Sequence, residues 1–93
     1  MLHPSAARRL IDLYHRTNQP RAAAARARID RLTARERDVL TLLARGDTNA
    51  DIAAGLHMRA STVKAHVSRV LTALDVTNRV RAALLARDAG LTT

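Results

Sequence analysis

Cysteine is absent from this 93-residue chain, so neither a disulfide framework nor a thiolate zinc site can form, and the chain suits a reducing compartment. Aromatic side chains are nearly absent too, since Tyr14 is the only one. No uninterrupted apolar run approaches the roughly 20 residues of a membrane-spanning helix. Arg8 and Arg9 stand where a signal peptide would be apolar. We therefore expect no membrane partner.

The arrangements that enzymes and metal sites need are missing as well. The four histidines, His3, His15, His57 and His66, show no metal-ligand spacing, and there is no glycine-rich phosphate loop. The carboxylates are scattered over capping and surface positions. We expect no enzyme, no cofactor and no metal.

Positive charge is the most pronounced property of the composition. The chain holds 16 basic residues, 15 of them Arg, against 8 acidic ones, a net charge of +8. Residues 1–31 contribute +5 and residues 32–93 contribute +3. A polyanion is the first partner to consider, although an Arg and Ala bias that only maintains solubility is an alternative.

The leading segment, residues 1–31, predicts a short helix followed by a linker. Residues 4–15 can form a helix that starts at Pro4. Pro20 should then break it, because the residue before a proline is pushed away from helical dihedrals. Residues 21–31 have little to bury and predict a linker of variable helicity. The helix would place Ala7, Leu10, Ile11 and Tyr14 on one side.

Residues 32–93 predict a compact unit of four helices, and the chain as a whole is predicted to be all-α. Thr33 with Glu36, and Thr48 with Asp51, have the spacing of capping boxes at two helix starts. A third helix runs from about Ser61 to Leu74 and a fourth from Asn78 to Gly90, with Gly46 and Asp75 suited to left-handed helix stops. The apolar residues that repeat at helical spacing are Val39, Leu40 and Leu43; Ile52, Ala53 and Leu56; Val63, Val67, Val70, Leu71 and Leu74; and Val80, Ala83 and Leu84.

The third of these helices has a second face that needs an explanation. At about 100 degrees per residue, its apolar residues fall on one side, and Lys64, Ala65, Ser68, Arg69 and Thr72 fall on or near the other. Lys, Arg, Ser and a small apolar side chain are the groups that a DNA major groove accommodates. An ordinary solvated face is the alternative, although it would more often carry Glu and Lys pairs four residues apart.

The preceding helix supports the DNA-binding interpretation. It is short and rich in small residues, namely Ala50, Ala53, Ala54 and Gly55, which would let two helices cross closely. A short helix, a tight connection and a longer helix with a polar outer face form a helix-turn-helix arrangement. The helix starts near Thr48 and Ser61 would direct free N–H groups at phosphates.

Four motifs between Leu32 and Leu91 carry a family resemblance. "LTxRExxVL", "GxxNxxIAxxL", "TVKxHVxxxLxxLxV" and "NRxxA" occur in this order over 60 of the 93 residues. In combination they closely resemble the LuxR-type (GerE-type) helix-turn-helix domain, the output domain of NarL/FixJ-type two-component response regulators. The resemblance implies a four-helix DNA-binding domain in which the third helix reads sequence and the fourth forms a homodimer on inverted-repeat DNA.

Matched position by position, the resemblance implies three groups of residues. Lys64, Ala65 and Ser68 would face bases, with Arg69 close by. Thr48, Asn49, Thr62 and His66 would lie near the DNA backbone, and the place of Arg59 and Ser61 at the start of the third helix adds them to this group. Val80, Ala83, Leu84 and Arg87 would carry dimer contacts.

This chain departs from the family pattern at two places. Family members commonly have Ser and then an acidic residue where Arg59 and Ala60 stand, so the usual cap of the recognition helix is missing. Ser61 would cap one turn later, or Arg59 would contact a phosphate instead. Ser68 is small where some relatives have Lys, which leaves the preferred sequence open.

The leading residues from Leu2 to Tyr14 resemble the connection between a receiver and an output domain. The resemblance thus implies an excised or naturally separate output domain of a bacterial, cytoplasmic regulator, with the receiver domain and RNA polymerase as further partners. Two alternatives stay open: a sigma-factor region-four-like promoter-binding domain, and a protein-interaction module without sequence-specific DNA binding. The helix from Asn78 to Gly90 argues against the first, because such a domain would not need it.

Overall fold

Five α-helices make up the part of the chain that the computed structural model describes, residues 4–91 without the side chains of residues 4–5 and 14–18. They are α1 (Pro4–Ile29), α2 (Ala34–Ala44), α3 (Asn49–Leu56), α4 (Ala60–Leu74) and α5 (Arg79–Asp88). No strand occurs between residues 4 and 91, so the predicted all-α class and the four-helix unit are confirmed. His3 lies outside the described residues, and the side chains of Tyr14 and His15 are among those not described.

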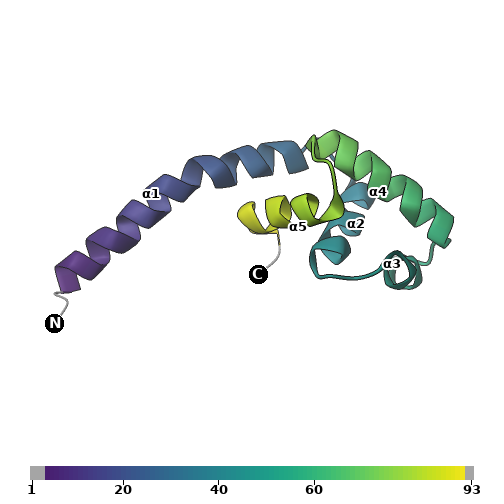
Figure 1. Cartoon of the computed structure of the whole chain (residues 1–93), viewed down its shortest axis with the longest axis horizontal. Coiled ribbons are helices and arrows are strands. Elements are labelled where there is room, and N and C mark those ends of the chain that lie inside the picture. Colours follow the sequence, from purple (N-terminus) through teal and green to yellow (C-terminus); the bar gives the residue numbers. More distant parts are fainter. Residues whose placement is uncertain (1–3, 92–93) are drawn as a thin grey trace.

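α1 is one continuous helix and not the predicted short helix with a linker. It runs through Pro20, curves along its length and projects from the other four helices, which gives the molecule extents of 56 × 23 × 21 Å (Figure 1). A proline inside a helix costs about 3 kcal/mol, so the predicted break had a sound local basis. The expectation that residues 21–31 bury little was wrong, because Ala25 and Ile29 are each only 5% exposed. Packing against α4 and α5 holds this segment in a helix despite the proline.

The starts of α2 and α3 are the two predicted capping boxes. The backbone N–H of Glu36 donates to Thr33 Oγ1 at 3.2 Å, and the Thr33 N–H donates to Glu36 Oε1 at 3.1 Å. The equivalent distances between Thr48 and Asp51 are 3.1 and 3.3 Å. These pairs satisfy N–H groups that a helix start leaves unpaired. Asn78 caps α5 as predicted, since its Oδ1 accepts from the Arg81 N–H at 2.9 Å.

Each of the helices α2 to α5 is followed within two residues by a residue with positive φ. Gly46 (φ 93°) and Asp75 (φ 56°) were predicted for this role, and His57 (φ 56°) and Gly90 (φ 76°) do the same. In all four cases the N–H of the following residue donates back to a carbonyl in the last turn, as Asp47 does to Leu42 at 3.2 Å. The helices are therefore separated by tight, hydrogen-bonded turns and not by long loops.

The hydrophobic core lies where α2 meets α3, α4 and α5, with the end of α1 closing one side. Most of the predicted apolar residues are buried, whereas Leu56 and Leu71 are partly buried at its edge. The buried residues are Ala25, Ile29, Leu32, Val39, Leu40, Leu43, Ile52, Ala53, Val63, Val67, Val70, Leu74, Ala82 and Ala86. On α5 the small Ala82 and Ala86 face the core, whereas Val80 and Leu84, two of the residues predicted for dimer contacts, are exposed.

Two arginines stabilise the ends of the helix-turn-helix pair. Arg35 Nη2 donates to the carbonyl of Leu56, the last residue of α3, at 2.8 Å. Arg28 Nη1 donates to the carbonyl of Leu74, the last residue of α4, at 3.2 Å. A cation near a helix C-terminus also interacts favourably with the helix dipole. Part of the positive charge is thus used inside the fold and is not all available to a partner.

Candidate nucleic-acid interface

The outward face of α4 carries the four side chains predicted to meet base edges. α4 packs into the core through Val63, Val67, Val70 and Leu74. On the other side, Lys64, Ala65, Ser68 and Arg69 are all exposed. This set, called the α4 face below, offers an ammonium group, a hydroxyl, a guanidinium and a methyl group within two turns. Such groups can donate to guanine N7 and O6 or contact a thymine methyl.

The N-terminus of α4 is open, which bears on the predicted phosphate contacts. Arg59 occupies the cap position, makes no side-chain capping hydrogen bond and is exposed, as are Ser61 and Thr62. Ser61 lies inside the first turn, so the alternative in which it caps the helix is wrong. No acidic residue stands in that first turn. The positive end of the helix dipole is therefore left uncompensated there, as an approaching phosphate would require.

The connection between α3 and α4 is short, but small residues contribute less to it than predicted. Of the four small residues on α3, only Ala53 is buried, whereas Ala50, Ala54 and Gly55 are exposed. A Cβ added at Gly55 would meet only Leu42 Cδ1, at an ordinary 3.6 Å. The left-handed backbone of His57, followed by the Met58 N–H donating to the Ala53 carbonyl at 2.9 Å, makes the turn tight. Backbone geometry accounts for the close connection better than helix composition does.

His66 and Arg69 on α4 both act electrostatically on Glu36, in the first turn of α2. Contacts with Thr33 hold the pKa of Glu36 below its ordinary value of 4.5, and the charges of Arg69 and His66 lower it further. His66 is half-buried, and its Nδ1 is the one buried side-chain nitrogen or oxygen without a hydrogen-bond partner among the described residues. The effect of Arg69 and His66 on the pKa of Glu36 could not be predicted from the sequence, because 30 or more residues separate them from it.

Acidification is expected to remove the stabilising effect of Glu36. Its folded pKa lies below 4.5, so its contribution is present above the unfolded value and is lost as the pH falls through the folded value. Urea unfolding of the wild type and of Glu36→Gln, at about pH 7 and about pH 3, measures this contribution. The difference in unfolding free energy between the two proteins should shrink at the lower pH. A difference that is the same at both pH values would contradict the expected role of the carboxylate.

Thr48 and Asn49 stand at the start of α3, beside the turn that follows α2. Thr48 is exposed, and its Oγ1 is the cap of α3. Asn49 is half-buried and its Oδ1 accepts from Arg79 Nη1 at 3.0 Å, while Arg79 Nη2 donates to the Asp47 carbonyl at 2.9 Å. Asp51 lies in the first turn of α3, so this helix start is already partly compensated, unlike that of α4. Arg79 is a residue that sequence reasoning did not connect with this turn.

α5 presents an apolar surface on the side away from the core. Val80 is 64% exposed and Leu84 is 54% exposed, while Ala83 is half-buried and Arg87 is exposed. These four residues, called the α5 surface below, are those predicted to carry dimer contacts. Large apolar side chains facing solvent on a helix whose buried positions are alanines indicate a surface suited to a partner.

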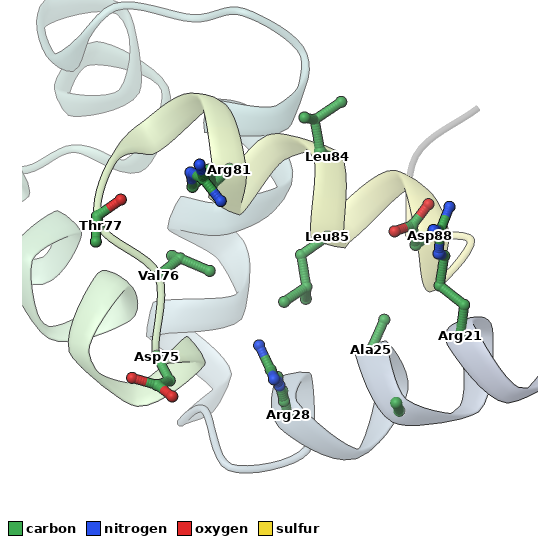
Figure 2. Close-up of a pocket in the computed structure, with 11 residues that line it drawn as sticks. Arg21, Ala25, Arg28, Asp75, Val76, Thr77, Arg81, Leu84, Leu85 and Asp88 are labelled. Carbon is green, nitrogen blue, oxygen red and sulfur yellow. The ribbon is translucent and has the colours of Figure 1, made fainter.

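A hollow of about 610 Å³ separates the second half of α1 from α5 and the α4–α5 connection. Figure 2 shows Arg28 and Ala25 on one side of it and Leu85 and Arg81 on the other, with Arg21 near Asp88. It lies at the C-terminal end of α4, about 20 Å along that helix from the open N-terminus. The hollow is therefore separate from the α4 face.

The described residues lack metal-ligand clusters and membrane-spanning helices. No group of three or more His, Cys, Asp or Glu side chains could hold a metal ion there. Nor is any described helix both long enough and apolar enough to cross a membrane.

Comparison with known proteins gives consistent matches over the helix-turn-helix region. Residues 30–86 match the family model described as "Bacterial regulatory proteins, luxR family". The uncharacterized transcriptional regulatory protein YhcZ of Bacillus subtilis is 53% identical over 55 residues, which are 59% of the chain and 26% of that protein. The response regulator protein VraR of Staphylococcus aureus is 44% identical over 55 residues, again 59% of the chain and 26% of that protein.

A third relative, the putative HTH-type transcriptional regulator YhjB of Escherichia coli, is 43% identical over 54 residues, 58% of the chain and 27% of that protein. The chain thus spans about a quarter of the length of these curated relatives. The family is one of DNA-binding transcriptional regulators and not of enzymes. Because the family model covers more than half of the residues, the chain belongs to the luxR family of bacterial regulatory proteins.

Proposed function

We propose that this chain binds specific double-stranded DNA sequences by inserting α4 into the major groove. The observation that carries the proposal is the α4 face, in which Lys64, Ala65, Ser68 and Arg69 are exposed together while the opposite side of α4 is anchored in the core. A rigidly held helix can present side chains to base edges in a fixed register, which sequence-specific recognition requires. The family of DNA-binding regulators to which the chain belongs supports this assignment.

Phosphate contacts would come from the two helix starts that flank the turn. At the start of α4, Arg59, Ser61 and Thr62 are exposed beside an uncompensated helix dipole. At the start of α3, Thr48 and Asn49 offer a hydroxyl and an amide. Such contacts fix the register of a protein on a duplex without reading its sequence. His66 is half-buried and would contact the backbone only through the exposed part of its ring.

On DNA the chain would act as a homodimer through the α5 surface. Val80 and Leu84 provide the exposed apolar area, and Ala83 and Arg87 border it. A two-fold dimer of this kind binds inverted half-sites about one helical turn apart. Because a response regulator is among the relatives and these proteins are about four times as long as the matched segment, the chain would be the output part of a two-component regulator in the bacterial cytoplasm. The receiver domain and RNA polymerase are the further partners proposed on that basis.

Selection of bound duplexes from a random pool tests the proposed function. We expect enrichment of an inverted repeat. The logarithm of the binding constant for this repeat should fall linearly with the logarithm of the salt concentration, by about 0.9 per neutralised phosphate. The matched measurement uses the same duplex with its half-sites scrambled. A pool that shows no enriched sequence would contradict base reading by the α4 face, and an enriched single half-site would contradict pairing through α5.

A further inference from the structure

Arg79 connects the first residue of α5 to the turn between α2 and α3. Its Nη2 donates to the Asp47 carbonyl at 2.9 Å and its Nη1 donates to Asn49 Oδ1 at 3.0 Å. Both hydrogen bonds are partly buried, and the residues they join are 30 and 32 positions apart in the chain. The two contacts use adjacent nitrogens of one planar guanidinium, so they fix the side chain in direction as well as in distance.

These contacts determine which way the Asn49 amide points. A guanidinium has five N–H donors and no acceptor, so only the oxygen of an amide can face it. The Nδ2 group of Asn49 must then point away from Arg79. No described residue accepts a hydrogen bond from Nδ2, and His66 Nδ1 is the one unpartnered side-chain nitrogen or oxygen of the described region that is buried. Nδ2 is therefore open to solvent with two free donors.

The position of Asn49 would allow these two donors to contact the DNA backbone. Asn49 is the first residue of α3 and directly follows Thr48, the cap residue at the positive end of that helix. In the helix-turn-helix arrangement the first helix of the pair crosses the phosphate backbone. An amide NH₂ group held there can donate to a phosphate oxygen, and holding it in advance reduces the conformational entropy lost on binding.

We propose that Arg79 is a positioning residue that orients the Asn49 amide so that Nδ2 donates to a DNA phosphate. The proposal rests on the proposed DNA-binding function and adds to it a contact between α5 and the start of α3. Because Arg79 begins α5, the helix that carries the pairing surface, the same guanidinium joins the pairing element to the phosphate-contacting element of one subunit. Arg79 does not itself touch the DNA in this arrangement.

Asn49→Asp is the most direct test. The aspartate keeps an oxygen facing Arg79 and strengthens that contact by its charge. It also replaces the outward NH₂ donor with an anionic oxygen that repels a phosphate. We expect affinity for the selected duplex to fall at least about tenfold. The slope of the logarithm of the binding constant against the logarithm of salt concentration should decrease in size by about 1. The midpoint of thermal unfolding should stay the same or rise, which separates a binding effect from a folding effect.

Arg79→Met and Asn49→Ala, alone and together, test the coupling. If Arg79 acts through Asn49, then Arg79→Met should weaken binding in the wild-type background and have little further effect once Asn49 is alanine. Arg81→Met is the matched control, because Arg81 is an exposed arginine two residues further along α5 whose side chain makes no hydrogen bond to the described residues. It removes the same charge and should leave binding within about twofold.

The outcomes are distinct. Asn49→Asp binding as tightly as the wild type would overturn the positioning role while leaving DNA binding intact. Equal losses from Arg79→Met and Arg81→Met would also overturn it, because charge alone would then explain the effect. A wild-type chain that binds no duplex even at low salt would instead refute the proposed function itself.

Discussion

Replacing Lys64 with alanine is expected to weaken binding to the selected duplex by about 1 to 3 kcal/mol and to relax specificity at one base pair. Lys64 is exposed in the second turn of α4, next to the open N-terminus and on the face turned away from the core. An ammonium group there can donate to the acceptors on a guanine edge. Fluorescence anisotropy on the selected duplex and on a scrambled duplex, at matched salt, measures both effects.

Arg9→Ala is the control for this prediction. Arg9 is exposed in the second turn of α1, and the N-terminal half of α1 projects away from the other helices (Figure 1). Its removal therefore changes the net charge by the same amount at a site away from α4. We expect Arg9→Ala to leave the ratio of specific to scrambled affinity unchanged. If Lys64→Ala instead weakened binding equally on both duplexes, Lys64 would contact phosphate and not a base.

Replacing Leu40 with alanine is expected to lower the free energy of unfolding by about 2 to 5 kcal/mol. Leu40 is among the largest fully buried side chains and lies on α2, which contacts α3, α4 and α5. The substitution removes apolar contacts and leaves a cavity at the point where the helices meet. Because single domains have a stability of about 5 to 15 kcal/mol, a substantial fraction would be lost. Urea unfolding followed by circular dichroism measures it.

Leu84→Ala supplies the matched comparison, since the same side chain is removed from a position that is 54% exposed. It should change the stability of the monomer by no more than about 0.5 kcal/mol. Its effect should appear as weaker pairing on the inverted repeat, with affinity for a single half-site retained. A loss of monomer stability as large as that of Leu40→Ala would show that Leu84 belongs to the core and would contradict its place in the α5 surface.

The helix starts and stops could be predicted because their causes are local. Thr33 with Glu36 and Thr48 with Asp51 are close in sequence, and each pair completes its hydrogen bonds within one turn of helix. Asp75 takes a left-handed conformation that few residues other than glycine tolerate. Such signals depend little on the rest of the molecule, and all of them are present in the structure.

The continuity of α1 could not be predicted, because two opposing effects had to be compared. The cost of Pro20 is visible in the sequence, whereas the gain from burying Ala25 and Ile29 and from the Arg28 contact with Leu74 depends on where α4 and α5 lie. α5 shows the same limitation. Its pattern of Val80, Ala83 and Leu84 resembles an ordinary core face, yet the residues that α5 buries fully are Ala82 and Ala86, with Leu85 partly buried beside them.

The sequence by itself determined the all-α class, the helix limits of the helix-turn-helix region and the outward direction of Lys64, Ala65, Ser68 and Arg69. These properties follow from capping and from the periodicity of the helix, which act over a few residues. Only the tertiary structure decided that α1 is continuous, that Val80 and Leu84 face outward, and that Arg79 holds Asn49. These depend on contacts between residues far apart in the chain, and such contacts exist only once the helices have packed together.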